Sequence, residues 1–370
     1  MRDNTIEAFF ALVRAGLFTF HCDGFKVNDS LFRDVEWEKV YLLAQEQSVQ
    51  GLVLAGLEYS DIKPPKELLL QWIGEVQMIE QKNRAMNAFI NQLIGDLRKA
   101  NIYTLMVKGQ GIAQCYERPL WRTCGDVDLF LSKNNYEKAK AFLSPLASSI
   151  QDEEKKRFHL SMTIDSWEVE LHGTLKTCLW RNLDKVIDEL HKEVFCGGAV
   201  RSWMNGKTQV FIPRADEDVV FVFAHILQHF YLGGVGLRQI CDWCRLLWMF
   251  RESLNYGLLE SRIREMGIMS EWKAFAYLAV NCLGMPVESM PLYSSSPRWN
   301  KKANVLLGLI LEMGNMGHSR DIEYQYNKPA SLRRVITFWR LTKDNARQLL
   351  ISPINPIRVW CNVVWSKLFH

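Results

Sequence analysis

The sequence has no long run of apolar residues that is also free of polar groups, which a membrane-spanning helix would need. The stretch Val219–Leu237 contains no Asp, Glu, Lys or Arg, but it includes His225, Gln228, His229 and three glycines. Polar side chains and glycines of this kind fit a buried helix that ends in a loop better than a segment exposed to lipid. We therefore expect no membrane span.

A disulfide framework is missing as well, because the nine cysteines are an odd number and are scattered along the chain. This usage fits a reducing cytoplasm better than an oxidising compartment. The N-terminus makes a poor signal peptide, because acidic residues come early and Arg14 interrupts the apolar stretch Ala8–Phe20. We therefore expect a cytoplasmic protein.

The chain also lacks a strong charge, since its net charge is only +4. We therefore expect no stable binding to nucleic acid. The charge is uneven: residues 301–370 hold 11 Lys and Arg against 4 Asp and Glu, which gives +7 there and −3 elsewhere. This basic region, with its amphipathic segment Ile357–Phe369, could contact an acidic partner, a nucleotide or a membrane surface. A solvated helical face that packs on the chain's own helices is the alternative.

Several well-known catalytic signatures are absent too. The sequence has no Gly-x-x-x-x-Gly-Lys-Ser/Thr phosphate loop, no Gly-x-Ser-x-Gly nucleophile elbow and no kinase signature set. It also shows no internal repeat and no low-complexity segment. The chemistry therefore has to come from another group of residues.

Apolar periodicity divides the chain into three regions. Helical spacing predicts helices over 34–58 and, with Pro65 at the start, over 65–100. Short strands follow, with a turn at Asp165-Ser166, and helical patterns return from Ala215. The predicted strands are Ile102–Val107, Val127–Leu131, Phe158–Ile164, Trp167–Leu171 and Gln209–Ile212, and short helices cover Ile112–Tyr116 and Tyr136–Leu143. We predict an α+β protein with an N-terminal helical region (1–100), a core built on a small mixed or antiparallel sheet (101–213) and a C-terminal helical region (214–370).

Two aspartates open one of these strands, where burying charge is expensive. Because side chains alternate along a strand, Asp126 and Asp128 share one face, and Val127 and Leu129 share the other. Two carboxylates so close repel each other unless a cation lies between them. Mg²⁺ typically takes one or two carboxylates together with substrate phosphates. The pair is therefore either a metal site at the edge of the sheet or an exposed strand end with two solvated acids.

Two neighbouring segments favour the metal site. Lys108-Gly109-Gln110-Gly111 lies between a strand and a helix, where backbone N–H groups can hold phosphate. In the strand that follows Ser166, the side chains of Glu168, Glu170 and His172 share one face. A carboxylate from this strand would complete a site for two metal ions. An amphipathic strand with one wet side is the alternative.

A zinc site is a further hypothesis. His225 and His229 are four residues apart on a predicted helix, and Cys241 and Cys244 follow as a Cys-x-x-Cys pair. Both pairs lie in apolar helical sequence, where buried cysteines and histidines satisfied by their neighbours are common. We therefore favour a structural role for these four residues.

Several of these segments occur together in one known family. They are Val107-Lys108-Gly109, Pro119 with Arg122 and Asp126–Phe130, Glu170-Leu171-His172, His225 with His229, and Leu237-Arg238 with Asp242. In this combination the chain resembles the uncharacterised nucleotidyltransferase family of the DNA polymerase β superfamily, from about residue 35 to about residue 250. That superfamily shares a glycine turn, an Asp-x-Asp strand and a third acid on a later strand.

The resemblance implies an enzyme that transfers a nucleoside monophosphate from an NTP to a hydroxyl group, with two Mg²⁺ ions as cofactors. It implies that Asp126 and Asp128 bridge both ions and that Glu170 holds the ion that activates the acceptor. It also implies phosphate-binding roles for Lys108, Gly109, Gln110 and Arg122, and an acceptor-facing position for His172, His229 and Asp242. The alternative for Lys108 is a solvated loop end, and the alternative for Arg122 is an ion pair with a nearby acid.

The function expected from the sequence is thus Mg²⁺-dependent nucleotidyl transfer to a small molecule or, as a second acceptor class, to a protein side chain. Two other classes stay open. One is a non-catalytic nucleotide-binding or regulatory module on the same fold. The other is an adaptor that docks on a membrane surface or a partner through its basic C-terminal helices.

Overall fold

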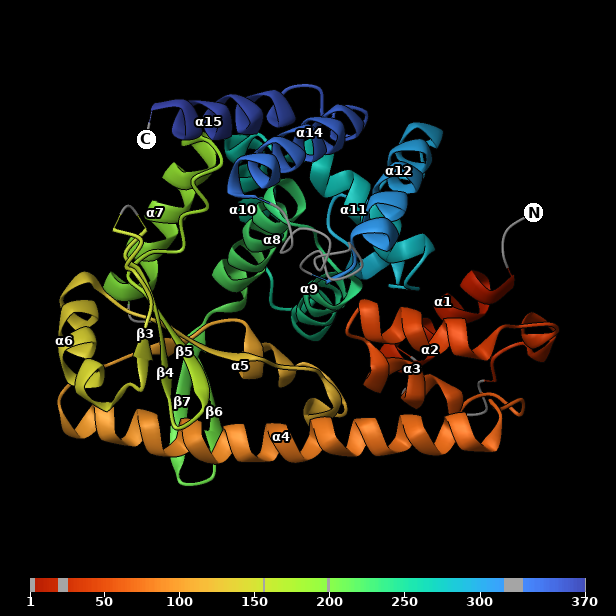
Figure 1. Ribbon diagram of the computed structural model, residues 1–370, viewed down its shortest axis with the longest axis horizontal. Coiled ribbons are helices and arrows are strands. Elements are labelled where there is room, and N and C mark those ends of the chain that lie inside the picture. The colour runs from red at the N-terminus through yellow and green to blue at the C-terminus, as the bar shows by residue number, and fades with distance from the viewer. Residues whose placement is uncertain (1–3, 19–25, 156, 198–199, 316–328, 370) are drawn as a thin grey trace.

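The computed structural model describes residues 4–18, 26–155, 157–197, 200–315 and 329–369 (Figure 1). The α-helices are α1 (Asn4–Phe18), α2 (Trp37–Glu46), α3 (Gln50–Leu57), α4 (Lys66–Lys99), α5 (Gly109–Ala113), α6 (Lys133–Leu143), α7 (Arg181–Cys196), α8 (Ala215–Leu232), α9 (Leu237–Phe250), α10 (Tyr256–Met266), α11 (Met269–Asn281), α12 (Pro297–Met313), α14 (Ala330–Gln348) and α15 (Asn355–Phe369). The strands are β1 (Leu105–Met106), β2 (Asp126–Phe130), β3 (Ser149–Ile150), β4 (His159–Ile164), β5 (Trp167–His172), β6 (Val200–Asn205) and β7 (Thr208–Pro213). The predicted α+β class, with a small mixed sheet and helical flanks, is confirmed.

The N-terminal helices differ in one respect from the prediction. The single helix expected over 34–58 is two helices, α2 and α3, because Ser48 between them has a left-handed backbone (φ 55°) that a continuous α-helix does not contain. The helix expected over 65–100 is confirmed as α4, which begins directly after Pro65. Figure 1 shows α4 (orange) running beneath both the N-terminal helices and the sheet.

Helix α4 connects two hydrophobic cores. Trp72, in its first half, belongs to a large core that joins α1–α3 to helices α8–α12. Met86, in its second half, belongs to a smaller core beneath the sheet. Between them, the side-chain amide of Asn83 donates hydrogen bonds to the backbone oxygens of Leu120 and Arg122, both at 2.8 Å. The helix therefore also fixes the loop that leads into β2.

The central sheet has the strand order β1-β2-β5-β4-β3, in which β2 and β5 are parallel and the other neighbours are antiparallel. β6 and β7 form a separate antiparallel hairpin that packs against β1 and α4. The strand expected over Ile102–Val107 is confirmed only at Leu105–Met106. Periodicity does not reveal β3 or β6, because β3 has two exposed residues and β6 buries none of its side chains fully.

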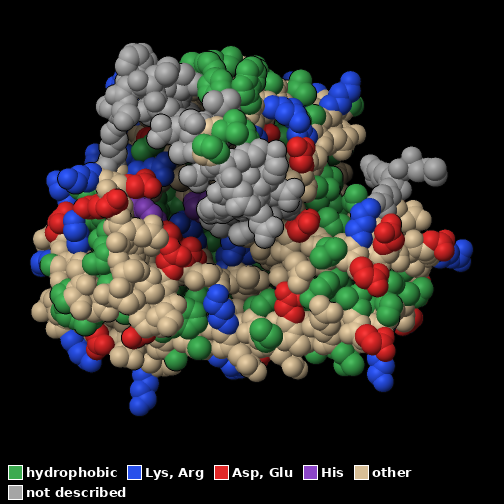
Figure 2. Space-filling view, viewed as in Figure 1, with side chains coloured by type: hydrophobic (Ala, Val, Ile, Leu, Met, Phe, Trp, Pro, Cys, Tyr) green, Lys and Arg blue, Asp and Glu red, His purple; other side chains and the backbone are tan. Residues whose placement is uncertain are grey.

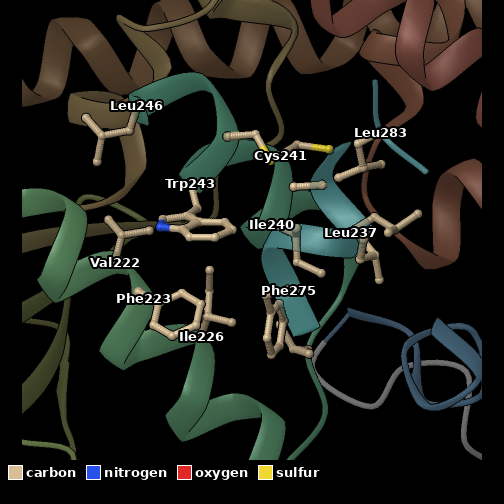
Figure 3. Packing of buried hydrophobic residues seen from close by; sticks show 14 of the residues in the cluster. Val222, Phe223, Ile226, Leu237, Ile240, Cys241, Trp243, Leu246, Phe275 and Leu283 are labelled. Carbon is tan, nitrogen blue, oxygen red and sulfur yellow. The ribbon is translucent and has the colours of Figure 1, made fainter. Parts of the chain in front are cut away.

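Helices α8 and α9 are held in place by aromatic and aliphatic packing. Figure 3 shows Phe223 of α8, Trp243 of α9 and Phe275 of α11 gathered with aliphatic side chains between the helices. The ring of Phe223 lies 4.9 Å from that of Trp243 and 5.5 Å from that of Phe275. These are distances at which aromatic pairs attract each other. This packing fixes the positions of α8 and α9, and therefore also the positions of the side chains on their other faces.

Among the residues that the structure describes, no helix combines the length and the apolar character needed to cross a bilayer. The segment expected to be amphipathic at the C-terminus lies in α15, which contacts α14. Val359 is buried in the large core, whereas Ile357 is exposed. The indole nitrogen of Trp360 donates a hydrogen bond to Oγ1 of Thr342 on α14 (3.2 Å). One side of α15 therefore packs on the chain's own helices, while the membrane contact and the three region boundaries stay predictions.

Helices α1 and α3 cross so closely that the contact requires two glycines. A Cβ atom on Gly56 would lie 2.0 Å from the carbonyl oxygen of Leu12, and one on Gly16 would lie 2.0 Å from that of Leu52. Both obstacles are backbone atoms within helices, which cannot move aside individually. The two glycines therefore set the distance between α1 and α3.

We expect Gly56→Ala to lower the midpoint of thermal unfolding, because its methyl group would push α1 and α3 apart, and overpacking of this kind costs about 1–3 kcal/mol. Gly74→Ala on α4 is the matched control, since a Cβ atom there meets nothing within 4 Å. Alanine stabilises a helix by about 1 kcal/mol over glycine, so the control should hold or raise the midpoint. Circular dichroism measures both midpoints, and equal values would contradict the close crossing.

Candidate active site

The parallel pairing of β2 with β5 brings the predicted acids together. It places Asp128 opposite Glu170, and Asp126 lies two residues earlier on the same face of β2. Carboxylate oxygens from all three residues lie within 4.8 Å of one another. Val127 and Val169 pair on the opposite face, inside the smaller core. The register that buries these valines therefore also makes the acids converge.

Two side chains bring positive charge or N–H groups to the acids. Nζ of Lys108 lies 2.8 Å from Oδ1 of Asp128, and Nε2 of His172 lies 2.8 Å from the same oxygen. The same nitrogen of His172 is 3.2 Å from Oε2 of Glu170. The Asp128 side chain is only 1% exposed, so these contacts replace the water that a carboxylate would otherwise need.

The turn that carries Lys108 has an unusual backbone. Lys108 has φ 55° and ψ −146°, and Gly109 has φ 38°. Holding a residue other than glycine in such a region costs about 1–3 kcal/mol. A Cβ atom on Gly109 would lie 3.3 Å from Sγ of Cys124 and 3.4 Å from the carbonyl oxygen of Asp126. The turn thus lies tightly against the start of β2. The strained residue is Lys108, whose side chain contacts Asp128.

The local charges shift the pKa of two of the acids. The neighbouring Asp128, and then burial, raise the pKa of Asp126 from 3.8 to about 6. Burial would raise the pKa of Glu170, but the contacts with His159 and His172 outweigh it, so this pKa is lowered. Of these two carboxyl groups, that of Asp126 therefore gives up its proton less readily than that of Glu170. A cation bound nearby would favour the loss of this proton.

The acids face an open cleft with a volume of about 300 Å³ between the sheet and helices α8 and α9. Figure 2 shows this face hollowed near its centre, with histidine and acidic side chains at the hollow. His225, His229 and Arg238 line the cleft from the helices, and Arg157 and Lys176 line it from loops beside the sheet. This volume falls at the lower end of the range of small-molecule binding pockets, about 300–1,000 Å³.

His225 and His229 face each other across one turn of α8, with their Nε2 atoms 3.0 Å apart. Burial, and then the charge of Lys108, lower the pKa of both rings, that of His229 to about 4. Both imidazoles are therefore neutral near neutral pH. A neutral ring can donate one hydrogen bond and accept another, so His229 can contact an uncharged polar ligand.

Arg122 and Asp242 form a buried ion pair in the wall of the cleft. Arg122 donates from Nε (2.8 Å) and Nη2 (2.7 Å) to the two carboxylate oxygens, and each side chain is 5% exposed. The hydroxyl of Tyr116 donates a further hydrogen bond to Asp242 (2.8 Å). The pair connects the loop before β2 to α9. Arg122 thus forms an ion pair with an acid, which is the alternative to phosphate binding that the sequence offers.

Gln110 points away from the acids. Its side chain is 1% exposed, and its Nε2 donates a hydrogen bond to Oδ1 of Asn83 on α4 (2.7 Å). The predicted site residues that line the cleft beside the three acids are Lys108, Gly109 and His172, whereas His229 lies on the helical wall and Arg122 with Asp242 forms the separate pair. The roles of all these residues stay predictions.

Sequence reasoning misses His159, which lies on β4 and contacts Oε2 of Glu170 through Nε2 at 3.2 Å. The signal for it is the hairpin turn at Asp165-Ser166, where both residues have positive φ (49° and 69°). Two-residue turns of this kind fix the register of the strands that they join. Counting back from the turn places His159 directly opposite His172, as the structure shows.

The structure does not gather the residues of the zinc hypothesis. Among the described residues, two groups of three side chains could hold a metal ion, and they share Glu170. One contains Asp126 and Asp128, and the other contains His159 and His172. Neither includes His225, His229, Cys241 or Cys244. The two cysteines are fully buried in α9, which fits their structural interpretation.

Without metal, we expect Asp126→Asn to raise the free energy of unfolding at about pH 7.5. The carboxyl ionises near 3.8 in the unfolded chain and near 6 in the folded one. The folded protein therefore holds the extra proton between these values and loses stability as the pH rises through them. Asparagine avoids this loss, so the gain is on the order of 1–3 kcal/mol above about pH 6 and disappears below about pH 4.

Urea titrations in the presence of a chelator, at several pH values, measure this gain. Asp152→Asn is the control, because Asp152 is an exposed acid outside the cleft. A gain that does not depend on pH would contradict the raised pKa of Asp126.

Comparison with protein families gives a match to the family described as uncharacterised nucleotidyltransferases, over residues 33–284. This range runs from before α2 to beyond α11 and includes the whole sheet and all three acids. Neither curated proteins nor solved structures give a match. Because the match covers more than half of the chain and the acids of the motif converge, the chain belongs to the uncharacterised nucleotidyltransferase family.

Proposed function

We propose that the protein transfers a nucleoside monophosphate from a nucleoside triphosphate to a hydroxyl group of a small molecule, with Mg²⁺ as cofactor. The observation that carries this proposal is the convergence of three carboxylates beside an open cleft, in a chain of a nucleotidyltransferase family. A protein side chain is the second acceptor class, because it offers the same hydroxyl group.

Asp126, Asp128 and Glu170 fit divalent cations. Their oxygens lie within 4.8 Å of one another, and Asp128 raises the pKa of Asp126 to about 6. Both facts indicate that the neighbouring cationic groups do not fully offset the repulsion among the three carboxylates. When bound, two Mg²⁺ ions would stabilise the attacking and leaving oxygens of the transfer. Asp126 and Asp128 would hold both ions, and Glu170 would hold one.

Glu170 suits the binding of a cation better than the acceptance of a proton. A general base works best when its pKa is near the working pH, and contacts with His159 and His172 lower the pKa of this carboxyl. We therefore assign Glu170 to metal binding. A proton from the acceptor hydroxyl would go to water or to another group in the cleft.

Lys108 would bind the phosphates of the nucleotide. Its ammonium group pairs with Asp128, and its side chain is 20% exposed. A metal ion on Asp128 would compete with this pair and free the ammonium group for phosphate oxygens. Arg238 is a second candidate: Nη1 donates to the carbonyl oxygen of Thr123 (2.9 Å), and Nε has no hydrogen-bond partner in the described part of the chain.

The acceptor would lie toward α8, because the turn at Lys108 and the acids occupy the opposite side of the cleft. His229 lines that wall and is neutral near neutral pH, since burial and then Lys108 lower its pKa to about 4. It can therefore bind a hydroxyl group without attracting a second anion. Asp242, committed to Arg122 and Tyr116, would shape the wall instead of touching the acceptor.

Calorimetry with ATP, GTP, CTP and UTP, each with and without Mg²⁺, tests the nucleotide site. We expect at least one nucleotide to bind more tightly with Mg²⁺, and Asp128→Asn to weaken that binding by about tenfold or more. Glu168→Gln is the matched control, because Glu168 lies on the same face of β5, bonds to Oγ of Ser161 (2.9 Å) and is outside the group of three acids. The proposed function is wrong if no nucleotide binds under any condition.

Transfer itself is followed by release of pyrophosphate and by movement of a labelled α-phosphate into hydroxyl-bearing small molecules. We expect Asp126→Asn and Asp128→Asn to lower the rate by about 100-fold or more. Nucleotide binding without release of pyrophosphate would instead support the non-catalytic nucleotide-binding module.

We expect Lys108→Met to change two affinities in opposite directions. Without the ammonium group, Asp128 is free for Mg²⁺, so Mg²⁺ alone should bind more tightly. The nucleotide should bind about tenfold more weakly, because its phosphates lose a cationic partner. Lys138→Met, at an exposed position on α6, is the control. Two changes of the same sign would show that Lys108 does not alternate between Asp128 and phosphate.

A further inference from the structure

We propose that His159, Glu170 and His172 form a binding site for a divalent transition-metal ion such as Zn²⁺, next to the Mg²⁺ position of the three acids. This inference rests on the proposed function, because Glu170 belongs to both groups. It goes further by assigning nitrogen ligands, and therefore a different class of metal ion, to one side of the cleft.

The geometry of the two hairpin strands creates this group. His159 on β4 lies directly opposite His172 on β5, and Glu170 is two residues before His172 on the same face. The Nε2 atoms of both histidines lie 3.2 Å from Oε2 of Glu170. One ligand atom from each of the three residues falls within 4.8 Å of the other two. Three ligand atoms thus converge, which is the number of protein ligands in catalytic zinc sites that keep a fourth position for water or substrate.

His159 supplies an observation that points to a missing ligand. Its Nε2 atom is buried and has no hydrogen-bond partner in the described part of the chain, although Oε2 of Glu170 is near. Its ring stacks on that of His172, with centroids 4.8 Å apart and planes 26° apart. The contact with Glu170 therefore lacks hydrogen-bond geometry, and a buried nitrogen that makes no well-formed hydrogen bond is costly. A metal ion bound by this nitrogen would remove the cost.

The chemistry of the ligands distinguishes this site from its neighbour. Imidazole is a preferred ligand for zinc and other late transition metals, whereas Mg²⁺ takes oxygen ligands almost entirely. Two histidines and one glutamate are a ligand set that binds zinc with an open fourth position. Asp126 and Asp128 offer only oxygen. Glu170 belongs to both groups, so the cleft can hold metal ions of two different classes.

A plain alternative is that the two histidines only neutralise Glu170. In that case the imidazoles act through charge and hydrogen bonding, and no metal ion replaces the contact between His159 and Glu170. The two interpretations differ in a measurable way. Metal binding requires nitrogen in the coordination shell of the ion, and a charge contact does not.

X-ray absorption at the zinc edge tests the proposal directly. The full chain is loaded with one equivalent of Zn²⁺ in the presence of excess Mg²⁺, which fills the oxygen site. We expect the scattering pattern of two imidazole ligands in the native protein and of one in His159→Gln. Zinc bound without imidazole, or bound through sulfur at the buried cysteines of α9, would overturn the proposal.

Competition with a chromophoric chelator gives the affinities. We expect His159→Gln to weaken Zn²⁺ by about tenfold or more, since even partners outside the coordination shell are commonly worth about 10–100-fold. The affinity for Mg²⁺ should stay nearly unchanged, because imidazole is not a ligand that Mg²⁺ favours. His191→Gln is the matched control: His191 is a partly buried histidine that packs on Phe130 and is not one of the three ligands. The proposal would also be overturned if His159→Gln and His191→Gln lost the same affinity for Zn²⁺. The same holds if His159→Gln lost as much affinity for Mg²⁺ as for Zn²⁺.

The failure of this inference differs from the failure of the proposed function. If Mg²⁺ and a nucleotide bind but zinc shows no imidazole ligand, only the transition-metal site is wrong. If zinc binds through two imidazoles but no nucleotide binds, the nucleotidyl transfer is wrong and the metal site stands. If neither binds, both are wrong.

Discussion

The parallel pairing of β2 with β5 is the constraint on which the rest of the site depends. Its register sets Asp128 beside Glu170, while Val127 and Val169 face the core from the other side. Because side chains alternate along a strand, a slip of one residue would move the acids into the core and the valines into the cleft. The hydrophobic pattern that stabilises the sheet therefore also determines where the charges meet, and hairpin pairing then adds His159 to the same face.

That arrangement has an electrostatic cost that the surrounding residues offset only in part. Lys108 and His172 both contact Oδ1 of Asp128, but Asp126 keeps a pKa raised to about 6, mainly because of Asp128. The backbone at Lys108 adds strain through its positive φ of 55°. Functional sites commonly keep such unfavourable features because the ligand removes them on binding. The cluster of acids has this character, because its own cationic neighbours leave the pKa of Asp126 raised.

The sequence predicts the parts of this molecule that follow from local periodicity. Alternation along one strand suffices to put Asp126 and Asp128 on one face, and the length of α4 follows from its apolar stripe. Local patterns do not show which residues, distant in the sequence, contact each other in the folded protein. Gln110 follows a glycine in a turn that resembles a phosphate-binding one, yet it bonds to Asn83 of a helix that crosses behind it. Arg122 meets Asp242, 120 residues later, because α9 packs against the loop before β2. No spacing in the sequence specifies these two contacts.

The arrangement of acidic and basic side chains in the cleft indicates how its ligands would enter. The acids lie on the strands, whereas Lys108 and Arg238 line the cleft close by. A triphosphate alone would be repelled by Asp126 and Asp128, and a metal ion alone would have to displace the ammonium group of Lys108. If both entered together, Asp126 and Asp128 would be neutralised by the metal ion and the ammonium group of Lys108 would be free to pair with phosphate, so each ligand would remove the obstacle to the other. Under the proposed function, such mutual dependence would make the site selective for a metal–nucleotide complex over either component.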